Sequence, residues 1–266
     1  MGGHGETDGP RSQEEIRENM LTLRSYRDYP LAFSGDRGRE FLSPPEKAEF
    51  DGLSFGPGKS SWLLSRIATK ELVQRYCDVK LNFVPDISDV VLTPDGPQQL
   101  AISIVGPQGD QIPALHARYA TSDHYVVSCL RKAEAGEGFS VSLDRVEARY
   151  PFANKSAYTE AEWDQVRFAA PEEADRVLAG LGAVKDALHR ASEPADALAL
   201  GLLSLRGDCE VDSPTSTRSH AGCWYFDHHV MAIAFTWRQP HLGPMQGARV
   251  EEEPVLPEAR HSEITL

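Results

Sequence analysis

A strand-like segment near the middle of the chain carries side chains whose types and spacing could do chemistry. The stretch FSVSLDRVEARYPF, residues 139–152, begins with an alternation of apolar and polar residues that is typical of a strand with one buried face. Phe139, Val141 and Leu143 fall on the apolar face, and Ser140, Ser142 and Asp144 fall on the other. A row of small polar side chains that ends in an aspartate could line a binding or catalytic site.

The composition of the whole chain narrows the class of protein. Its 266 residues are 41% hydrophobic, which is typical of a folded globular protein, and its net charge of −13 argues against a nucleic-acid partner. No run of 18 apolar residues and no signal peptide is present, so we expect no membrane association and a cytoplasmic location. The four cysteines form no CxxC pair, which favours buried free thiols over a zinc site or disulfides.

Two pairs of helices are expected, one on each side of this strand. In SPPEKAEF, Ser43 can cap a helix whose first turn holds Pro44, and Glu46 completes a capping box. A long amphipathic helix should follow from about Ser60 to Cys77. Later in the chain, Thr159 and Glu162 open another short helix, and residues 171–191 form another long one.

Several strand-like runs accompany these helices. They are VVLT, QLAISIVG, HYVVSCL, GFSVSLDRV and YFDHHVMAIAFTW. Near the start of the chain, Ser12 and Glu15 resemble a capping box for a short helix that would carry Met20 and Leu23. Helices and strands do not alternate regularly, so the predicted fold class is α+β.

An internal repeat predicts that the molecule is built from two similar halves. RIATKELVQR at 66–75 matches LGAVKDALHR at 181–190, with Lys70 aligned to Lys185, and DHYVVSCL at 123–130 matches DHHVMAIA at 227–234. We therefore expect a pseudo-twofold duplication of a helix packed on an antiparallel sheet, with a cleft between the halves as the favoured ligand site. The expected divisions are an N-terminal extension (1–34), a first half (35–135), a second half (136–240) and a disordered acidic tail (241–266).

Over about residues 40–237 the chain resembles the 4′-phosphopantetheinyl transferases, in particular the monomeric surfactin-type group with two duplicated halves. FLSPPEKAEF is similar to a Ser-Pro-Glu helix of that family, and WLLSRIATKELVQRY is similar to its WLLGRxAAKEAV helix. SLDRVEAR, TEAEW and GAVKDALHR are similar to its DIERVEPR, FTEAE and WSAKEAALK segments. The segments occur in the family's order and spacing.

This resemblance implies a function and a set of partners. Members of the family bind coenzyme A between their halves, hold a divalent metal on its pyrophosphate, and move the phosphopantetheine arm onto a serine of an acyl, peptidyl or aryl carrier protein. Adenosine 3′,5′-bisphosphate is released. Carboxylates hold the metal, because magnesium prefers hard oxygen ligands.

The chain departs from the family at the positions that the resemblance assigns to the metal. Ser142 stands where the first metal-binding Asp is expected, Asp144 stands for a Glu on the same strand, and Asp186 stands for a Glu on the long helix. Lys185 matches the lysine beside that Glu, and Arg190 falls where another Lys is usual. One metal carboxylate is therefore absent and two have changed length.

The positions that the resemblance assigns to coenzyme A also differ. Thr121 replaces a phosphate-contacting His, Ser122 keeps the last Ser of the family's SHS segment, and Ser61 replaces an Arg. Arg66 could contact a phosphate or pair with a carboxylate. The remaining candidates for coenzyme binding are Arg66, Ser122 and Lys185.

Three hypotheses for the function follow. The first, which we favour, is the same fold recruited without a cofactor to dehydrate, cyclise or isomerise a small-molecule or carrier-bound, polyketide-type intermediate in secondary metabolism. Its acid and base groups would be Asp144 and Asp186, assisted by Lys185 or His189, which lies one turn after Asp186.

The second hypothesis is an active transferase that uses coenzyme A and magnesium, with Asp144 and Asp186 as metal ligands. The third is a non-catalytic module that binds a carrier protein. The triplet DHH at 227–229 is interpreted as a turn that opens a strand rather than as a metal site.

Overall fold

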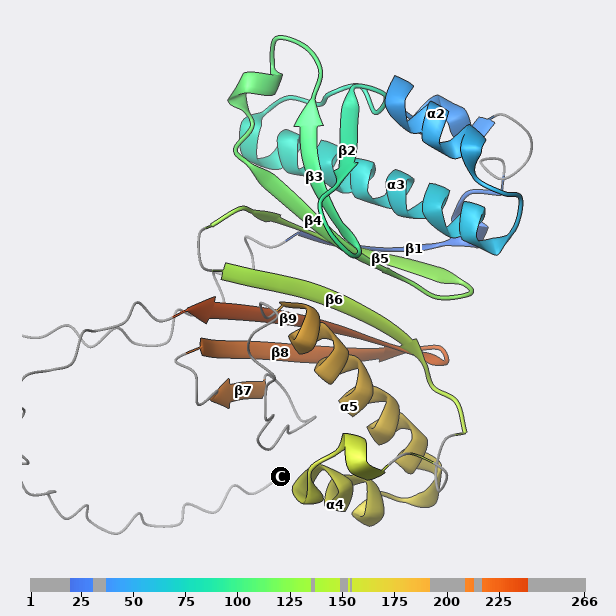
Figure 1. Ribbon diagram of the computed structural model, residues 1–266, viewed down its shortest axis with the longest axis vertical. Coiled ribbons are helices and arrows are strands. Elements are labelled where there is room, and N and C mark those ends of the chain that lie inside the picture. Colours follow the sequence, from blue (N-terminus) through green and yellow to red (C-terminus); the bar gives the residue numbers. More distant parts are fainter. Residues whose placement is uncertain are drawn as a thin grey trace, which may run out of the picture.

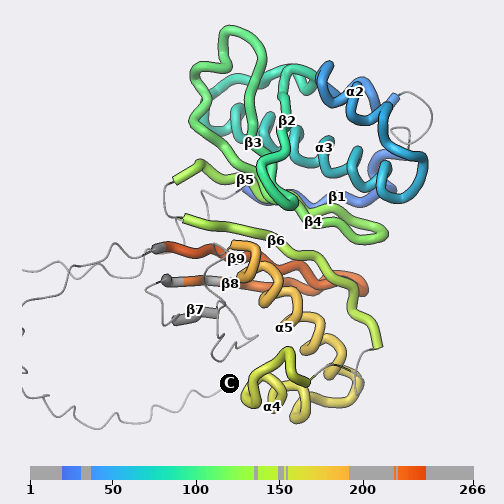
Figure 2. Tube along the Cα trace, viewed as in Figure 1, coloured from blue at the N-terminus to red at the C-terminus, as the bar shows by residue number. Residues whose placement is uncertain are grey.

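The computed structural model describes residues 20–30, 37–134, 137–148, 153, 155–191, 209–212 and 217–238. The fold is α+β, with two antiparallel sheets that face each other and helices on the outer side of each (Figure 1). The chain runs through one helix-and-sheet layer and then through the other, as the colour order in Figure 2 shows. Within the described residues, no helix is both long enough and apolar enough to cross a membrane.

The first sheet has the strand order β1-β5-β4-β3-β2. Its strands are β1 (Met20–Ser25), β2 (Val90–Pro94), β3 (Gln99–Ile104), β4 (Leu115–Thr121) and β5 (Tyr125–Lys132). The helices that accompany it are α2 (Pro44–Gly52) and α3 (Pro57–Tyr76), followed by a π-helical turn (Cys77–Leu81). Short 3-10 turns occupy Tyr26–Asp28, Arg37–Phe41 and Gly109–Gln111.

The second sheet has the strand order β6-β9-β8-β7. Its strands are β6 (Glu137–Arg145), β7 (Cys209–Asp212), β8 (Thr217–Phe226) and β9 (His229–Arg238). Its helices are α4 (Glu160–Phe168) and α5 (Pro171–Ala191), and a 3-10 turn (Lys155–Ala157) precedes them. The apolar face of α5 packs on β6 and β9.

Side chains from both sheets form the core between them. Its buried members are Ala120, Val127, Cys129, Phe139, Val141, Met231 and Ile233. The alternation predicted for β6 is confirmed, because Phe139 and Val141 enter this core while Ser140 and Ser142 are buried on the opposite face. β6 therefore directs its small polar groups at α5.

The capping boxes predicted at the starts of two helices are confirmed. The backbone N–H of Ser43 donates to Glu46 at 2.9 Å at the start of α2, and that of Thr159 donates to Glu162 at 2.8 Å at the start of α4. Each glutamate thereby satisfies a backbone group that the helix leaves without a partner. These local signals explain why the helix starts were readable from the sequence.

The start of the chain differs from the sequence-based expectation. Met20 and Leu23 belong to strand β1, which pairs antiparallel with β5 from Met20↔Leu130 to Ser25↔Tyr125, and not to a helix. Part of the predicted extension 1–34 is thus an edge strand of the first sheet. Leu21 and Leu23 pack against the core between the sheets. This packing and the pairing with β5 stabilise a strand at this position and not a helix. The Ser12 capping box and the tail 241–266 lie outside the described residues.

Candidate functional site

Strand β6 and helix α5 bring two of the predicted site residues into direct contact. The hydroxyl of Ser142 donates a hydrogen bond to Oδ2 of Asp186 at 2.7 Å. Ser142 is buried on the face of β6 that meets α5, and Asp186 is partly buried. Ser142 and Asp186, which the sequence resemblance placed at metal-ligand positions, therefore lie side by side.

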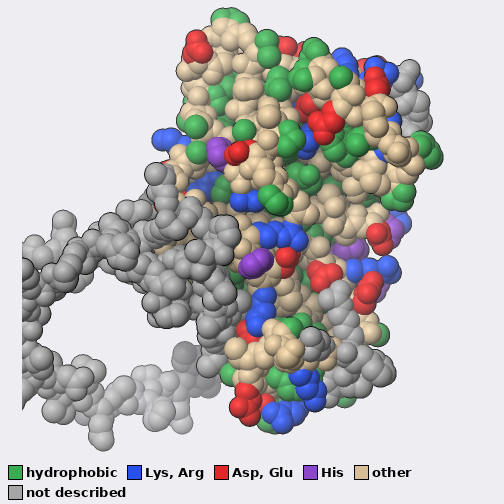
Figure 3. Space-filling view, viewed as in Figure 1, with side chains coloured by type: hydrophobic (Ala, Val, Ile, Leu, Met, Phe, Trp, Pro, Cys, Tyr) green, Lys and Arg blue, Asp and Glu red, His purple; other side chains and the backbone are tan. Residues whose placement is uncertain are grey.

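Arg190 provides a positive charge for the same carboxylate. Its Nη2 lies 2.7 Å from Asp186 Oδ2, four residues earlier on α5. The other nitrogen of the guanidinium, Nη1, donates to Oε1 of Gln98 in the turn between β2 and β3. The charge of Asp186 is thus balanced by Arg190, which also forms a hydrogen bond with the first half of the molecule. On the face shown in Figure 3, charged and histidine side chains gather between the two layers.

The arrangement of Ser142, Asp186 and Arg190 does not fit magnesium, which prefers several hard oxygen ligands in octahedral geometry. Ser142 is a neutral hydroxyl whose hydrogen points at Asp186, and Oδ2 of Asp186 already accepts from Ser142 and forms an ion pair with Arg190. Among the residues that the structure describes, no group of three His, Cys, Asp or Glu side chains is placed to hold a metal ion.

Asp144 lies two residues beyond Ser142 on the same face of β6. Its Oδ1 accepts a hydrogen bond of 2.8 Å from the backbone N–H of Arg145, and the side chain is partly exposed. Asp144 therefore keeps access to solvent at the end of the strand.

Lys185 has partners that give it a structural role. Its Nζ lies 2.7 Å from Oε2 of Glu162 and donates to the carbonyl of Ala157 at 2.9 Å. Glu162 is the fully buried capping residue of α4. Lys185 thus ties the short helix of the second half to the long one.

Arg66 is enclosed in the first half. It is 2% exposed, its Nε lies 3.9 Å from Oε1 of Glu46, and its guanidinium lies 4.7 Å from the centre of the Trp62 ring. Of the two roles left open by the sequence, pairing with a carboxylate is the one that the structure displays. A coenzyme contact would need surface that this side chain does not present.

The two remaining candidates are Ser122, in the turn between β4 and β5, and His189, on α5 three residues after Asp186. Ser122 accepts hydrogen bonds from the backbone N–H groups of His124 at 3.4 Å and Tyr125 at 3.2 Å, so it shapes the β4–β5 turn. His189 is exposed on α5, in the turn after Asp186. Ser142, Asp186 and Arg190 are consequently the cluster that the fold assembles.

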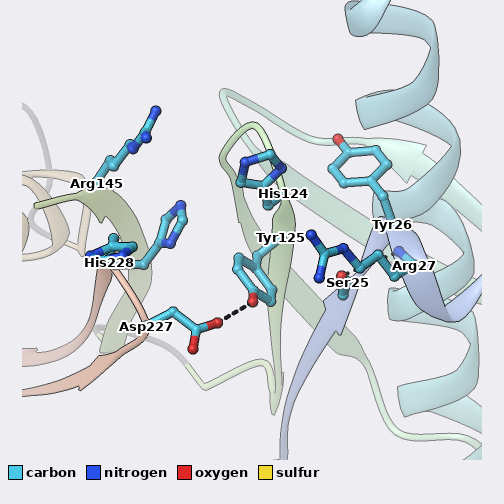
Figure 4. A pocket seen from close by; sticks show the side chains of 9 residues that line it. Ser25, Tyr26, Arg27, His124, Tyr125, Arg145, Asp227 and His228 are labelled. Atoms are coloured by element: carbon cyan, nitrogen blue, oxygen red, sulfur yellow. Dashed lines mark hydrogen bonds between the residues drawn. The ribbon is translucent and has the colours of Figure 1, made fainter.

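A pocket of about 430 Å³ lies where two hairpin turns from different sheets meet. One turn joins β4 to β5, and the other joins β8 to β9 at Asp227, whose φ is 46°. The pocket is lined by Ser25, Tyr26, Arg27, His124, Tyr125, Arg145, Asp227, His228 and His229 (Figure 4). The sequence-based candidates did not include these residues, although the repeated DHY and DHH triplets mark the two turns.

A hydrogen bond crosses between the two turns at this pocket. The hydroxyl of Tyr125 donates to Oδ2 of Asp227, as the dashed line in Figure 4 shows. This bond raises the pKa of Tyr125 above its usual value, so the phenol remains protonated at neutral pH. Arg27 extends toward this bond from the first half in the same view. Nη1 of Arg145 lies 4.0 Å from Oδ2 of Asp123 in the β4–β5 turn.

His229 is the buried member of the pocket lining. It is 3% exposed, and neither ring nitrogen hydrogen-bonds to any residue in the described part of the chain. Its ring centre lies 5.0 Å from that of Tyr125 and 5.9 Å from that of Phe226. Burial lowers the pKa of His229, and the neighbouring His124 and Arg145 lower it further. The imidazole is therefore neutral at pH 7.

Comparison with known proteins adds no assignment: no protein-family model matches the sequence, and no curated protein matches it.

Proposed function

We propose that the chain is a phosphopantetheinyl transferase-like protein that performs acid–base chemistry, without a metal, on a carrier-bound or small acyl intermediate. The reaction class is dehydration, cyclisation or isomerisation, each of which moves one proton from the substrate and returns one to it. The support comes first from the architecture and then from the Ser142–Asp186–Arg190 cluster.

The order of elements supports a duplicated fold. In each half the first strand pairs with the last one, β1 with β5 and β6 with β9, and a short helix followed by a long helix comes between them. The matched turns at Asp123 and Asp227 each precede the last strand of their half. Together these features support the pseudo-twofold duplication and the transferase-like fold.

A matched ion pair supports the same duplication at the level of side chains. Nζ of Lys70 lies 2.6 Å from Oε2 of Glu46, and Nζ of Lys185 lies 2.7 Å from Oε2 of Glu162. In both halves the glutamate caps the short helix and the lysine lies on the long one. Lys70 and Lys185 are the residues that the sequence repeat aligned.

The contact between Ser142 and Asp186 is the observation that carries the functional proposal. A carboxylate with one hydroxyl donor and one guanidinium has its charge balanced without a metal. The carboxylate of Asp186 can accept a proton from a substrate. Asp144, near the end of β6, is the second carboxyl group. His189 is an exposed group on α5 that can relay protons to solvent.

The alternative is an active transferase with coenzyme A and magnesium. Arg27 and Arg145 in the pocket between the turns are the residues that favour it, because guanidinium groups bind phosphate well. The same two arginines suit the phosphate of a carrier-bound phosphopantetheine arm.

The mass of a carrier protein after incubation distinguishes the acid–base enzyme from the transferase. The protein is incubated with apo carrier proteins, coenzyme A and magnesium, and the carriers are weighed by mass spectrometry. We expect no conversion to the holo form. Efficient conversion would overturn the proposal in favour of the transferase.

A second arm tests acid–base chemistry directly. Holo carriers loaded with β-hydroxyacyl and polyketide-type chains are incubated with the protein and analysed for loss of water or for a changed retention time at equal mass. Asp186→Asn and Asp144→Asn should abolish any conversion. Glu172→Gln, in the exposed first turn of α5, is the matched control and should retain it. Equal conversion by all four proteins would contradict the assigned roles.

A further inference from the structure

The pocket between the two hairpin turns combines positive charge with a buried, unsatisfied imidazole. Arg27 and Arg145 reach it from the ends of β1 and β6, and Asp227 is its carboxylate, already bonded to Tyr125. Two arginines and one aspartate therefore give the non-histidine part of the lining a net positive charge. A concave site of this charge attracts anions.

His229 adds an independent observation that points to a ligand. Buried polar groups in folded proteins almost always have a hydrogen-bond partner. Both nitrogens of His229 lack one among the described residues, and the ring lines the pocket. A ligand oxygen in the pocket would supply the missing partner.

We propose that this pocket binds a small anionic group, the phosphate or carboxylate of a larger ligand, and that His229 takes up a proton when the anion binds. The inference concerns the pocket whose arginines were considered above for a phosphopantetheine phosphate, but it does not require the acid–base reaction, because its test measures binding and protonation alone. It concerns a site formed by the repeated Asp-His turns and not the cluster around Asp186.

The direction of the pH dependence follows from the groups around His229. These are Asp123, His124 and Tyr125 from the β4–β5 turn and β5, Arg145 from β6, Asp227 and His228 from the β8–β9 turn, and Arg27 beyond β1. Burial, His124 and Arg145 lower the pKa of His229 in the free protein, whereas a bound anion favours its charged form. Anion binding should therefore tighten as the pH falls through the pKa of His229 in the complex, and level off below its pKa in the free protein.

The experiment uses sulfate as the probe, because sulfate keeps its charge over the range in which histidine titrates. Protein carrying ¹³C-labelled histidine is titrated by NMR in sodium sulfate and in sodium chloride of equal ionic strength, and His229→Gln assigns the His229 signal. We expect sulfate to raise the pKa of His229 by about one unit, which corresponds to about tenfold tighter sulfate binding at pH values below its pKa in the free protein than at pH values above its pKa in the complex.

Acetate, titrated in the same way, distinguishes the two anion chemistries. A stronger response to sulfate assigns the pocket to phosphate groups, and a stronger response to acetate assigns it to carboxylates. If neither anion moves the His229 signal or its pKa, the inference is wrong. The titration uses the unaltered protein, and triple-resonance NMR assigns the His229 signal if His229→Gln does not fold.

Variants at the two arginines complete the test. Arg27→Gln and Arg145→Gln remove exposed side chains from the pocket rim and should each weaken sulfate binding several-fold. Arg75→Gln, exposed on α3, and His116→Gln, on β4, lie outside the pocket lining and should leave it unchanged. Full sulfate affinity in both pocket variants would also overturn the inference.

Discussion

At the scale of single residues, one carboxylate and its two partners decide what the candidate site can do. Asp186 accepts from Ser142 and pairs with Arg190, so its charge is balanced within the protein. A carboxylate at position 142 would instead place two negative charges side by side. Such a pair needs either a proton or a cation to hold it together.

The first prediction concerns magnesium. The triple variant Ser142→Asp, Asp144→Glu and Asp186→Glu introduces the carboxylates that the sequence resemblance to the transferases predicts at these positions. It should bind magnesium about tenfold or more tightly than the unaltered protein, because carboxylate oxygens are strong ligands for this ion. Isothermal titration calorimetry measures the change, with Ser142→Ala as the control that adds no charge. Tight magnesium-dependent binding of coenzyme A by the unaltered protein would show that its site is intact.

At the scale of elements, a short helix is attached to a long helix by one buried pair in each half. Glu46 and Lys70 are both almost fully buried, whereas Lys185 beside Glu162 is 21% exposed. Removing one partner of a buried pair leaves the other charge without compensation, and solvent can compensate only the exposed one.

The second prediction compares the two pairs. Glu46→Gln should lower the free energy of unfolding by about 3 kcal/mol, and Glu162→Gln should lower it by less, about 1–2 kcal/mol. Urea unfolding followed by circular dichroism measures both. The reverse order would mean that burial of the lysine does not set the cost.

The third prediction concerns the close approach of β6 to the end of α5. A Cβ atom on Gly138 would lie 1.8 Å from the carbonyl oxygen of Ala191 and 2.5 Å from Oγ1 of Thr236, which itself donates to that carbonyl. Gly138→Ala should therefore lower the free energy of unfolding by about 2–3 kcal/mol. Gly52→Ala, with nothing within 4 Å of the added atom, is the matched control and should cause no loss. Equal stability of the two variants would show that α5 can shift away freely.

At the scale of the whole molecule, the apolar core between the sheets holds the two halves together. Phe139 and Val141 from the second sheet meet Val127 and Cys129 from the first. Because both sheets depend on this shared core, we expect the halves to unfold in one transition.

The fourth prediction tests this coupling. Phe139→Ala should lower the free energy of unfolding by about 3–4 kcal/mol through loss of buried apolar contacts. Phe168→Ala, at a side chain that is 80% exposed, should change it by less than about 0.5 kcal/mol. Tryptophan fluorescence and circular dichroism are followed during urea unfolding. Two separate transitions in the unaltered protein would show that the halves fold independently.

Local signals account for the parts of the fold that could be predicted from the sequence. The capping boxes at Ser43 and Thr159 and the alternation along 139–143 depend only on neighbours within a few residues, and the structure confirms them. Strand β1 was mistaken for part of a helix because six residues with apolar Leu21 and Leu23 acquire their conformation from pairing with β5, which is distant in the sequence. Strand β4 was missed for the same reason, since its partners lie on β3 and β5.

The sequence by itself determined the α+β class, the start of each short helix and the types of residue at the candidate site. Only the tertiary structure decided how those residues combine. Asp186 meets Ser142 because α5 packs on one face of β6, and Arg190 balances its charge on the next turn of the same helix. The pocket with His229 exists because two hairpin turns from different sheets meet once the core between them forms. Contacts between residues so far apart in the sequence depend on how the sheets pack, and no local pattern specifies that packing.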